Sequence, residues 1–240
     1  MIGFALCHGW AFDASAMRLL SSHLRAYFPQ HKQAFFDLGF TGTPHTPRLD
    51  KHIHWIAIGH SYGFAYLMQH NIDWRGAIAI NGFTRFCQPV PVLEETDKAT
   101  HKSRPRNSTQ GIPAWIIDAM YARLLVDTHG TIAAFYARCI DVGTIELPIP
   151  TTLVREALAL HLKKLRDTDM TLPICPLLAI AACDDTIVST TQARAQFQRH
   201  PKMHYIELTG NHLLPLTATQ ACANAIAQFL ASLSMEISHA

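Results

Sequence analysis

The sequence predicts an α/β protein in which a mostly parallel sheet of about six strands carries helices on both faces. Short, almost wholly apolar runs, typical of strands buried on both faces, alternate along the chain with longer segments of helical periodicity. This alternation produces parallel strands. The 240 residues are 49% hydrophobic and 16% charged, which is enough apolar material for one large core.

The predicted strands are apolar runs that end at glycine, asparagine or other turn residues. The first run ends at His8-Gly9-Trp10, the third at Gly59 and the fourth at Asn81-Gly82. The six strands are expected at residues 2–7, 33–37, 53–58, 76–80, 177–182 and 203–208.

Helices are predicted where apolar residues recur every three or four positions. Asp13 is a suitable N-cap for the first helix, and Pro215 suits the first turn of the last one. The predicted helices span residues 13–27, 61–70, 112–139, 151–166, 190–199 and 215–233.

A long segment between the fourth and fifth strands contains no strand of its own. It begins with residues 88–112, which hold three prolines, several charges and little periodicity, and continues as helix. We expect residues 1–82 and 173–240 to form the core around the sheet. Residues 83–172 are expected to form a helical cap inserted over one edge of that sheet.

Composition excludes several classes of function. Twenty Lys and Arg against 18 Asp and Glu give a net charge of +2, whereas nucleic-acid-binding proteins carry a strong basic excess. No apolar run reaches the roughly 18–20 residues of a membrane span, and the first residues lack the pattern of a signal peptide. Six cysteines without C-x-x-C spacing predict buried thiols in a reducing, cytoplasmic compartment. The histidines are scattered, and the closest pair, His52 and His54, has no metal-site context, so no metal is expected.

The strongest motif is Gly59-His60-Ser61-Tyr62-Gly63, which lies between a predicted strand and a predicted helix. In that context a G-x-S-x-G turn exposes the serine hydroxyl, and its glycines allow strand and helix to pack closely. The helix also directs its free amides and positive end toward an oxyanion formed there. We therefore expect Ser61 to be a nucleophile, with a simple helix cap as the alternative.

A serine nucleophile needs a base, because its hydroxyl is weak at neutral pH. His212 directly follows the last predicted strand, where a loop residue reaches the strand ends. The acid is expected after the fifth strand, where Asp184 and Asp185 are adjacent and only one can easily reach His212. The alternative acid position, after the fourth strand, holds Asn81.

An acyl-transfer intermediate also needs two preorganised amide donors for its oxyanion. One is expected from Tyr62, the residue after the nucleophile. The other is expected from Trp10, in the loop after the first strand. Alone, the His-Gly-Trp tripeptide is an ordinary turn, and its role follows from its place beside the other three elements.

With these motifs the sequence resembles the α/β-hydrolase superfamily over nearly the whole chain. The family's D-x-x-V pattern identifies Asp185 as the triad acid. Within the superfamily the chain is most similar to small carboxylesterases that demethylate pimeloyl-[acyl-carrier protein] methyl ester in biotin synthesis. That similarity rests on the His-Gly-Trp tripeptide, a four-helix-like cap and residues 135–136 and 160–166. The motifs shared with the superfamily are His8-Gly9-Trp10, Asp37-Leu38-Gly39-Phe40-Thr41-Gly42, Gly59-His60-Ser61-Tyr62-Gly63, Asp185-Thr186-Ile187-Val188 and Gly210-Asn211-His212.

The resemblance implies a serine carboxylesterase that hydrolyses this methyl ester to free the pimeloyl carboxylate and methanol, without a cofactor. The alternatives are a general short-chain carboxylesterase or thioesterase with the same triad, and a non-catalytic binding protein of the same fold. The chain departs from the family pattern by starting at the usual third strand, so the leading strands are missing. Only about ten residues separate Gly42 from the next strand, too few for the usual helix. The exposed sheet edge suits a monomer or weak homodimer.

Substrate and partner contacts are expected on the cap. An apolar slot above Ser61 suits an acyl chain, with plain core packing as the alternative. Residues 85–166 hold eleven Lys and Arg against eight Asp and Glu, which suits an acidic acyl-carrier protein, although a solvated helix face accounts for the same charges. The candidate slot walls are Trp10, Tyr62, Phe83, Trp115, Tyr121, Phe135 and Leu213. The carrier-binding candidates are Arg123, Arg138, Arg155 and Lys163, together with Arg104, Arg106, Lys164 and Arg166.

Overall fold

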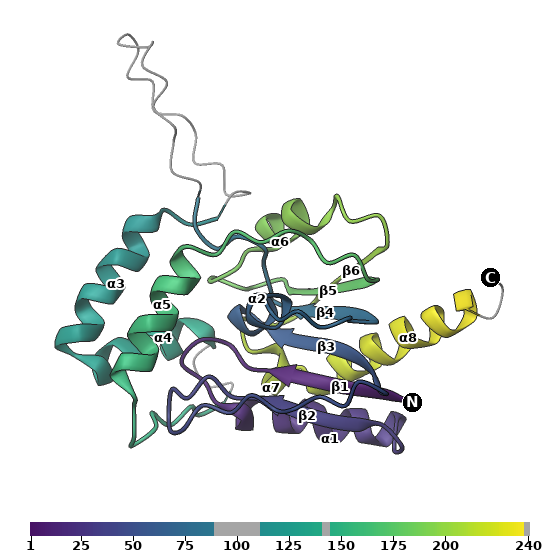
Figure 1. Cartoon of the computed structure of the whole chain (residues 1–240). Helices are drawn as coiled ribbons and strands as arrows, with labels where there is room; N and C mark the ends of the chain where they lie inside the picture. Colours follow the sequence, from purple (N-terminus) through teal and green to yellow (C-terminus); the bar gives the residue numbers. More distant parts are fainter. Residues whose placement is uncertain (89–110, 141–144, 238–240) are drawn as a thin grey trace, which may run out of the picture.

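The computed structural model describes residues 1–88, 111–140 and 145–237, and within these ranges the chain forms one six-stranded sheet flanked by helices (Figure 1). The strand order is β2-β1-β3-β4-β5-β6, and every neighbouring pair is parallel, as predicted. The strands are β1 (Ile2–Cys7), β2 (Lys32–Phe36), β3 (His54–His60), β4 (Gly76–Ile80), β5 (Leu177–Ala182) and β6 (Met203–Leu208). β1, β4, β5 and β6 have the predicted bounds, and the other two are displaced by one or two residues.

Helices cover both faces of the sheet, which explains why its strands are apolar throughout (Figure 1). α1 (Arg18–Tyr27), α7 (Leu214–Thr217) and α8 (Thr219–Ile237) pack on one face, and α2 (Tyr62–Met68) and α6 (Thr190–Phe197) on the other. In β4 the large Ile78 and Ile80 face the first group, whereas Ala77 and Ala79 face α2 and α6. The small alanines leave room for the phenylalanines that these two helices contribute.

The predicted helix over residues 112–139 is two helices, α3 (Ala114–Val126) and α4 (Thr128–Cys139). Asp127 breaks it with φ −137° and ψ 87°, and its carboxylate accepts a 2.8 Å hydrogen bond from the Gly130 amide as the N-cap of α4. The apolar periodicity continues across this break, so periodicity alone did not reveal it.

Three other helices differ from their predicted bounds. Asp13 caps a short 3₁₀ turn, Ala14–Met17, that precedes α1. The helix predicted from residue 151 begins as α5 (Arg155–Arg166), and the last predicted helix is divided into α7 and α8.

Helices α3, α4 and α5 lie together beyond the carboxyl ends of the strands (Figure 1). The described part of residues 83–172 therefore holds three helices, where a four-helix-like cap was expected. The division into core and cap at residues 83 and 172 stays a prediction. Residues 89–110, with Arg104 and Arg106, and residues 141–144 lie outside the described ranges.

The segment between β2 and β3 contains no helix, as its length predicted. β2 lies at one edge of the sheet and pairs with β1 alone among the described strands. In the described ranges, no helix combines the length and apolar character needed to cross a membrane.

Candidate active site

The site lies at one rim of the sheet, where the parallel strands end. Because all six strands run the same way, the loops that follow them meet at the same edge. Trp10 follows β1, Ser61 follows β3, Asp185 follows β5 and His212 follows β6. Residues far apart in the sequence are thus brought together by the direction of the strands.

Ser61 occupies a strained turn between β3 and α2, with φ 52° and ψ −124°. Its amide donates to the carbonyl of Ile80, which anchors the turn to β4. Both flanking glycines are required by packing. A Cβ on Gly59 would lie 2.2 Å from the Phe64 Cα, and one on Gly63 would lie 2.3 Å from the His8 carbonyl oxygen.

The structure brings Ser61, His212 and Asp185 into one hydrogen-bonded chain. The Ser61 Oγ lies 3.0 Å from Nε2 of His212, and Nδ1 of the same ring lies 2.7 Å from Oδ2 of Asp185. All three residues are buried. Since an ionised carboxylate only accepts hydrogen bonds, Nδ1 carries the proton of the neutral ring, and Nε2 is left to accept from the serine hydroxyl.

Backbone geometry distinguishes the two adjacent aspartates. Oδ1 of Asp185 accepts the amides of Ile187 and Val188 at 2.7 and 2.9 Å, which leaves Oδ2 directed at His212. Asp184 is exposed, and its amide donates to the carbonyl of Gly210. Asp185 is therefore the aspartate placed to orient the imidazole.

Asn81 holds the His212 loop in place, a role that sequence reasoning missed. Its side-chain amide donates to the carbonyls of Asn211 and His212 at 3.1 and 2.9 Å, while its Oδ1 accepts the Ala182 amide at 2.9 Å. It links the end of β4 to the end of β5 and to the loop after β6. The available signal was a polar side chain at the end of a wholly apolar strand.

His60 is a second support that the sequence analysis did not identify. Its Nε2 lies 2.7 Å from the carbonyl oxygen of His212. Burial, together with the neighbouring His212, lowers the pKa of His60 to about 3. The ring is therefore neutral at pH 7, and its Nε2–H donates to that carbonyl.

The backbone amides of Tyr62 and Trp10 are the predicted donors to the oxyanion. Tyr62 is the first residue of α2, so its amide has no helical acceptor. The loop after β1 lies against the serine, since a Cβ on Gly9 would lie 3.2 Å from the Ser61 Cβ. Among the described residues, neither the Tyr62 nor the Trp10 amide donates to another backbone group. Their assignment as oxyanion donors stays a prediction.

Ser61 lines a small apolar cavity of about 80 Å³ between the strand ends and the cap helices. Two predicted wall residues, Trp10 and Phe135, line it. Helical periodicity in the sequence included Ile116, Met120, Leu162 and Leu165, but it did not show what their faces pack against. The lining is completed by Phe86, Ile112, Ile116, Ile117, Met120, Arg138, Leu162, Leu165 and Ile187.

The other five predicted wall residues lie outside this cavity. Trp115 is 61% exposed, because its side of α3 faces away from the sheet. The Tyr62 side chain turns toward the cap, and Lys163 lies over the Tyr121 ring. Phe83 and Leu213 are buried in the main core cluster.

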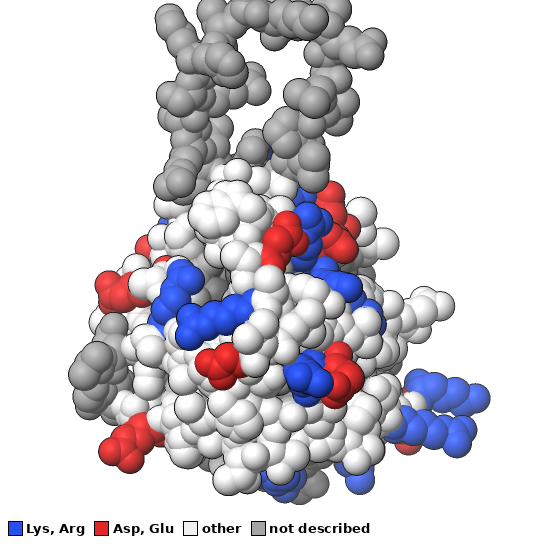
Figure 2. Space-filling model, turned by 90° about the vertical axis from the view of Figure 1, so that its left-hand side faces the viewer, with Lys and Arg blue, Asp and Glu red and all other residues white. Residues whose placement is uncertain are grey.

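Several of the predicted carrier-binding cations have contacts within the chain. Arg123 and Arg138 donate to the carbonyls of Gly130 and Thr186, and Arg155 lies 3.7 Å from its neighbour Glu156. The view onto the cap side shows basic and acidic side chains intermixed and separated by uncharged surface (Figure 2). Carrier binding by these residues stays a prediction.

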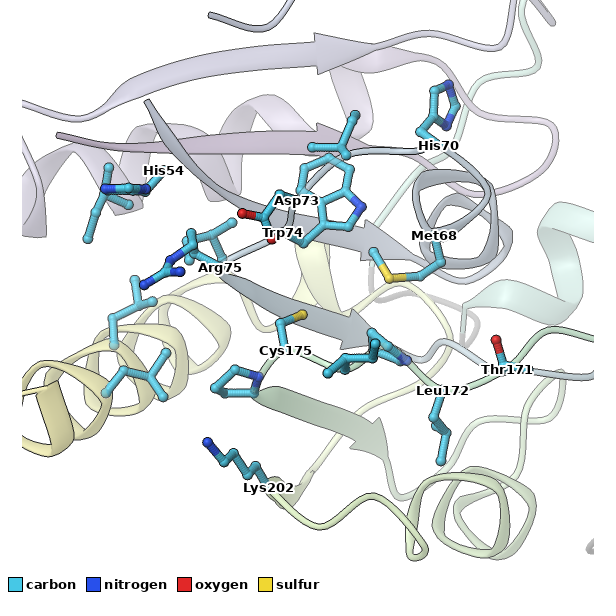
Figure 3. Close-up of a pocket in the computed structure, with 18 residues that line it drawn as sticks. His54, Met68, His70, Asp73, Trp74, Arg75, Thr171, Leu172, Cys175 and Lys202 are labelled. Carbon is cyan, nitrogen blue, oxygen red and sulfur yellow. The ribbon is translucent and has the colours of Figure 1, made fainter. Parts of the chain in front are cut away.

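A larger groove, with a volume of about 860 Å³, lies at the opposite, amino ends of the strands (Figure 3). His54 and His70 lie on opposite sides of the Trp74 ring, and Cys175 lies apart from both. Burial raises the pKa of the Cys175 thiol to about 11, so it is protonated at neutral pH. The groove thus lacks the paired nucleophile and base found at Ser61.

Comparison with known proteins establishes the fold. No family model and no curated protein matches the sequence. The structure is similar to an esterase from Exiguobacterium antarcticum, with a TM-score of 0.71 and 12% identity over 95% of this chain and 91% of that one. A thermophilic esterase from Thermogutta terrifontis has a TM-score of 0.71 and 15% identity over 97% and 90%. BioG from Haemophilus influenzae has a TM-score of 0.57 and 16% identity over 88% of each chain. The predicted α/β-hydrolase fold is confirmed.

Proposed function

We propose that the protein is a serine ester hydrolase, with Ser61 as nucleophile, His212 as general base and acid, and Asp185 as the carboxylate that orients His212. The observation that carries the proposal is the buried chain from the Ser61 hydroxyl through His212 to Asp185, with distances of 3.0 and 2.7 Å. Its position at the floor of an apolar cavity supports a substrate with an apolar group beside the ester. The esterases among the structural neighbours accord with this activity.

The mechanism follows from which atoms face one another. His212 accepts the Ser61 proton at Nε2 while Oγ attacks the ester carbonyl, and Asp185 stabilises the imidazolium that forms. The amides of Trp10 and Tyr62 donate to the oxyanion of the tetrahedral intermediate. Collapse breaks the ester C–O bond, and His212 returns the proton to the leaving alcohol. Water then hydrolyses the acyl-enzyme by the same route, with His212 again as base.

We propose the methyl ester of a pimeloyl-[acyl-carrier protein] as the substrate, which makes methanol the leaving alcohol and the carrier protein the partner. The proposal is supported by the resemblance of the sequence to biotin-synthesis carboxylesterases and by BioG among the structural neighbours. The cap cations Arg123, Arg138, Arg155 and Lys163 are the candidates for contact with the acidic carrier.

The size of the cavity favours a second candidate, a general short-chain carboxylesterase or thioesterase. Its volume of about 80 Å³ is roughly half that of the ~150 Å³ engineered cavity that takes up benzene. A methyl or short acyl group fits within this volume, whereas a seven-carbon chain would extend beyond it.

Replacement of the nucleophile tests the enzyme assignment. In Ser61→Ala, ester turnover is expected to fall by at least roughly 10⁴-fold, because no other group in the site can form the acyl-enzyme. A fluorophosphonate probe should label the native protein and leave the variant unlabelled. Ser22→Ala, on the exposed surface of α1, is the matched control and should keep full activity. Unchanged hydrolysis by a folded Ser61→Ala protein excludes the proposed function.

A comparison of two substrates tests the finer assignment. Methanol release from the methyl pimeloyl-carrier protein should be faster than from free short-chain methyl esters. Expression of the protein should also restore growth to a biotin auxotroph that lacks its own esterase. Equal rates on both substrates, with no rescue, favour the general esterase.

A further inference from the structure

The loop that follows β1 is held by the cap at three successive residues. The Trp10 indole N–H donates to the carbonyl of Leu158 in α5 at 2.9 Å. The Tyr136 hydroxyl, from α4, donates to the Ala11 carbonyl at 2.7 Å, and the Tyr136 ring stacks on Phe12 with centroids 4.9 Å apart. Ala11 has a φ of 67°, a strained conformation for alanine that this hydrogen bond helps to maintain.

Tyr62, the residue after the nucleophile, is held by α5, the helix that also accepts the Trp10 hydrogen bond. The Tyr62 hydroxyl lies 3.1 Å from Nδ1 of His161, which is one helical turn beyond Leu158 in α5. Both side chains are buried, and the rings of Phe40 and Tyr66 pack around the imidazole. Burial lowers the pKa of His161 to about 4, so this contact joins a neutral ring to a phenol at pH 7.

These contacts involve the two residues whose amides are the expected oxyanion donors. Trp10 and Tyr62 lie more than fifty positions apart in the sequence, yet their side chains bond to one turn of α5. We infer that the cap positions the oxyanion hole, with His161 and Tyr136 as positioning residues that hold Tyr62 and the loop after β1 in place. This inference rests on the proposed function and assigns the cap a part in transition-state stabilisation in addition to substrate binding.

Positioning matters because an oxyanion donor stabilises the transition state only when it already points at the developing charge. A donor held in place costs no reorganisation during the reaction, whereas a loop free to shift loses part of this stabilisation. Substrate in its ground state depends less on this aim, so loss of a positioning contact lowers kcat more than it raises KM.

The test uses variants that remove single contacts. Tyr136→Phe deletes the hydroxyl on the Ala11 carbonyl and keeps the stacked ring. His161→Leu deletes the contact with Tyr62, and His161→Asn restores a polar group near the position of Nδ1. Tyr27→Phe is the control, since it removes a tyrosine hydroxyl that bonds Asn224 between α1 and α8. For each variant, kcat and KM are measured per active site titrated with a fluorophosphonate, together with the melting temperature and the inhibition constant of n-butylboronic acid, whose tetrahedral serine adduct carries an oxyanion.

We expect Tyr136→Phe and His161→Leu each to lower kcat about tenfold and to weaken boronate inhibition by a similar factor, with KM changed less than about twofold. His161→Asn should recover most of the loss, and Tyr27→Phe should match the native protein. Tyr62→Phe combined with His161→Leu should be no worse than His161→Leu alone, because both changes break one contact.

The inference is overturned if Tyr136→Phe and His161→Leu keep native kcat and boronate inhibition per titrated site. It is also overturned if their losses appear only in KM or only as a smaller folded fraction. Failure of the proposed function is seen separately, as a native protein that the fluorophosphonate does not label.

Discussion

Hydrogen bonds at individual residues hold strained backbone conformations in this protein. Ser61 and Asn81 are non-glycine residues with positive φ, at 52° and 49°, and both are buried. Such conformations persist only where surrounding contacts determine them. For Ser61 the contact is its amide on the Ile80 carbonyl, and for Asn81 it is its amide on the Ile180 carbonyl together with its side-chain bonds.

At this scale we predict that Asn81→Asp disables the site without unfolding the protein. Aspartate tolerates the same backbone conformation, but it replaces the donor facing the carbonyls of Asn211 and His212 with a second acceptor. Displacement of the His212 loop should lower kcat by about tenfold or more, the equivalent of roughly 1.4 kcal/mol for a lost hydrogen bond.

Steady-state kinetics and circular dichroism check this prediction. The matched control is Asn224→Asp, on the far side of the sheet in α8, where activity should be unchanged. A fully active Asn81→Asp protein would show that His212 is held in place without this amide.

The position of α4 depends on the residue at which α3 ends. Residues 112–139 read as one helix in the sequence, and the break at Asp127 allows α4 to fold back and carry Phe135 and Tyr136 to the loop after β1. A single continuous helix would extend past the sheet, and the cavity above Ser61 would lose one wall. The positions of Phe135 and Tyr136 therefore depend on a local capping interaction at Asp127.

We predict that Asp127→Ala destabilises the protein by about 1 kcal/mol, because the Gly130 amide loses its N-cap acceptor. Asp127→Asn and Asp127→Ser keep a capping oxygen and should retain most of the stability. Urea denaturation of the three variants measures the difference. Equal midpoints for the alanine and serine variants would show that this cap contributes nothing to stability.

At the scale of the whole molecule, the burial of two neutral histidines makes stability depend on pH. The pKa of His60 is about 3 and that of His161 about 4, against an ordinary value of 6.5. Below pH 6.5 the unfolded chain therefore binds protons that the folded protein does not. The free energy of unfolding should therefore decrease as the pH is lowered from about 6.5 toward 4. At pH values above about 6.5 both histidines are neutral in the folded and unfolded states, so the pH does not change their contribution.

Denaturant unfolding from pH 7.5 to pH 5 measures this dependence. His161→Asn removes one of the two histidines. The slope of the unfolding free energy against pH should therefore decrease by at most the contribution of one bound proton. An unchanged slope in this variant would mean that His161 takes up a proton equally in the folded and unfolded states.

The parallel sheet, the bounds of four of its six strands and the places of Ser61 and His212 could be predicted from local pattern, whereas the choice of Asp185 over Asp184 came from the family resemblance. Buried strands read as apolar runs, and parallel strands bring their following loops to one rim whatever lies between them. The glycines around Ser61 were also informative, because a tight turn requires small residues at its own positions in the sequence.

Only the tertiary structure decided what each apolar face packs against. Periodicity marked the apolar faces of α3 and α5, yet it did not show that Ile117 and Leu162 line the cavity while Trp115 faces solvent. Nor did it show that Asn81 and His161 support the site, because their contacts join residues more than ninety positions apart. A local pattern specifies what a segment must bury, and the packing of the whole chain decides against what it is buried.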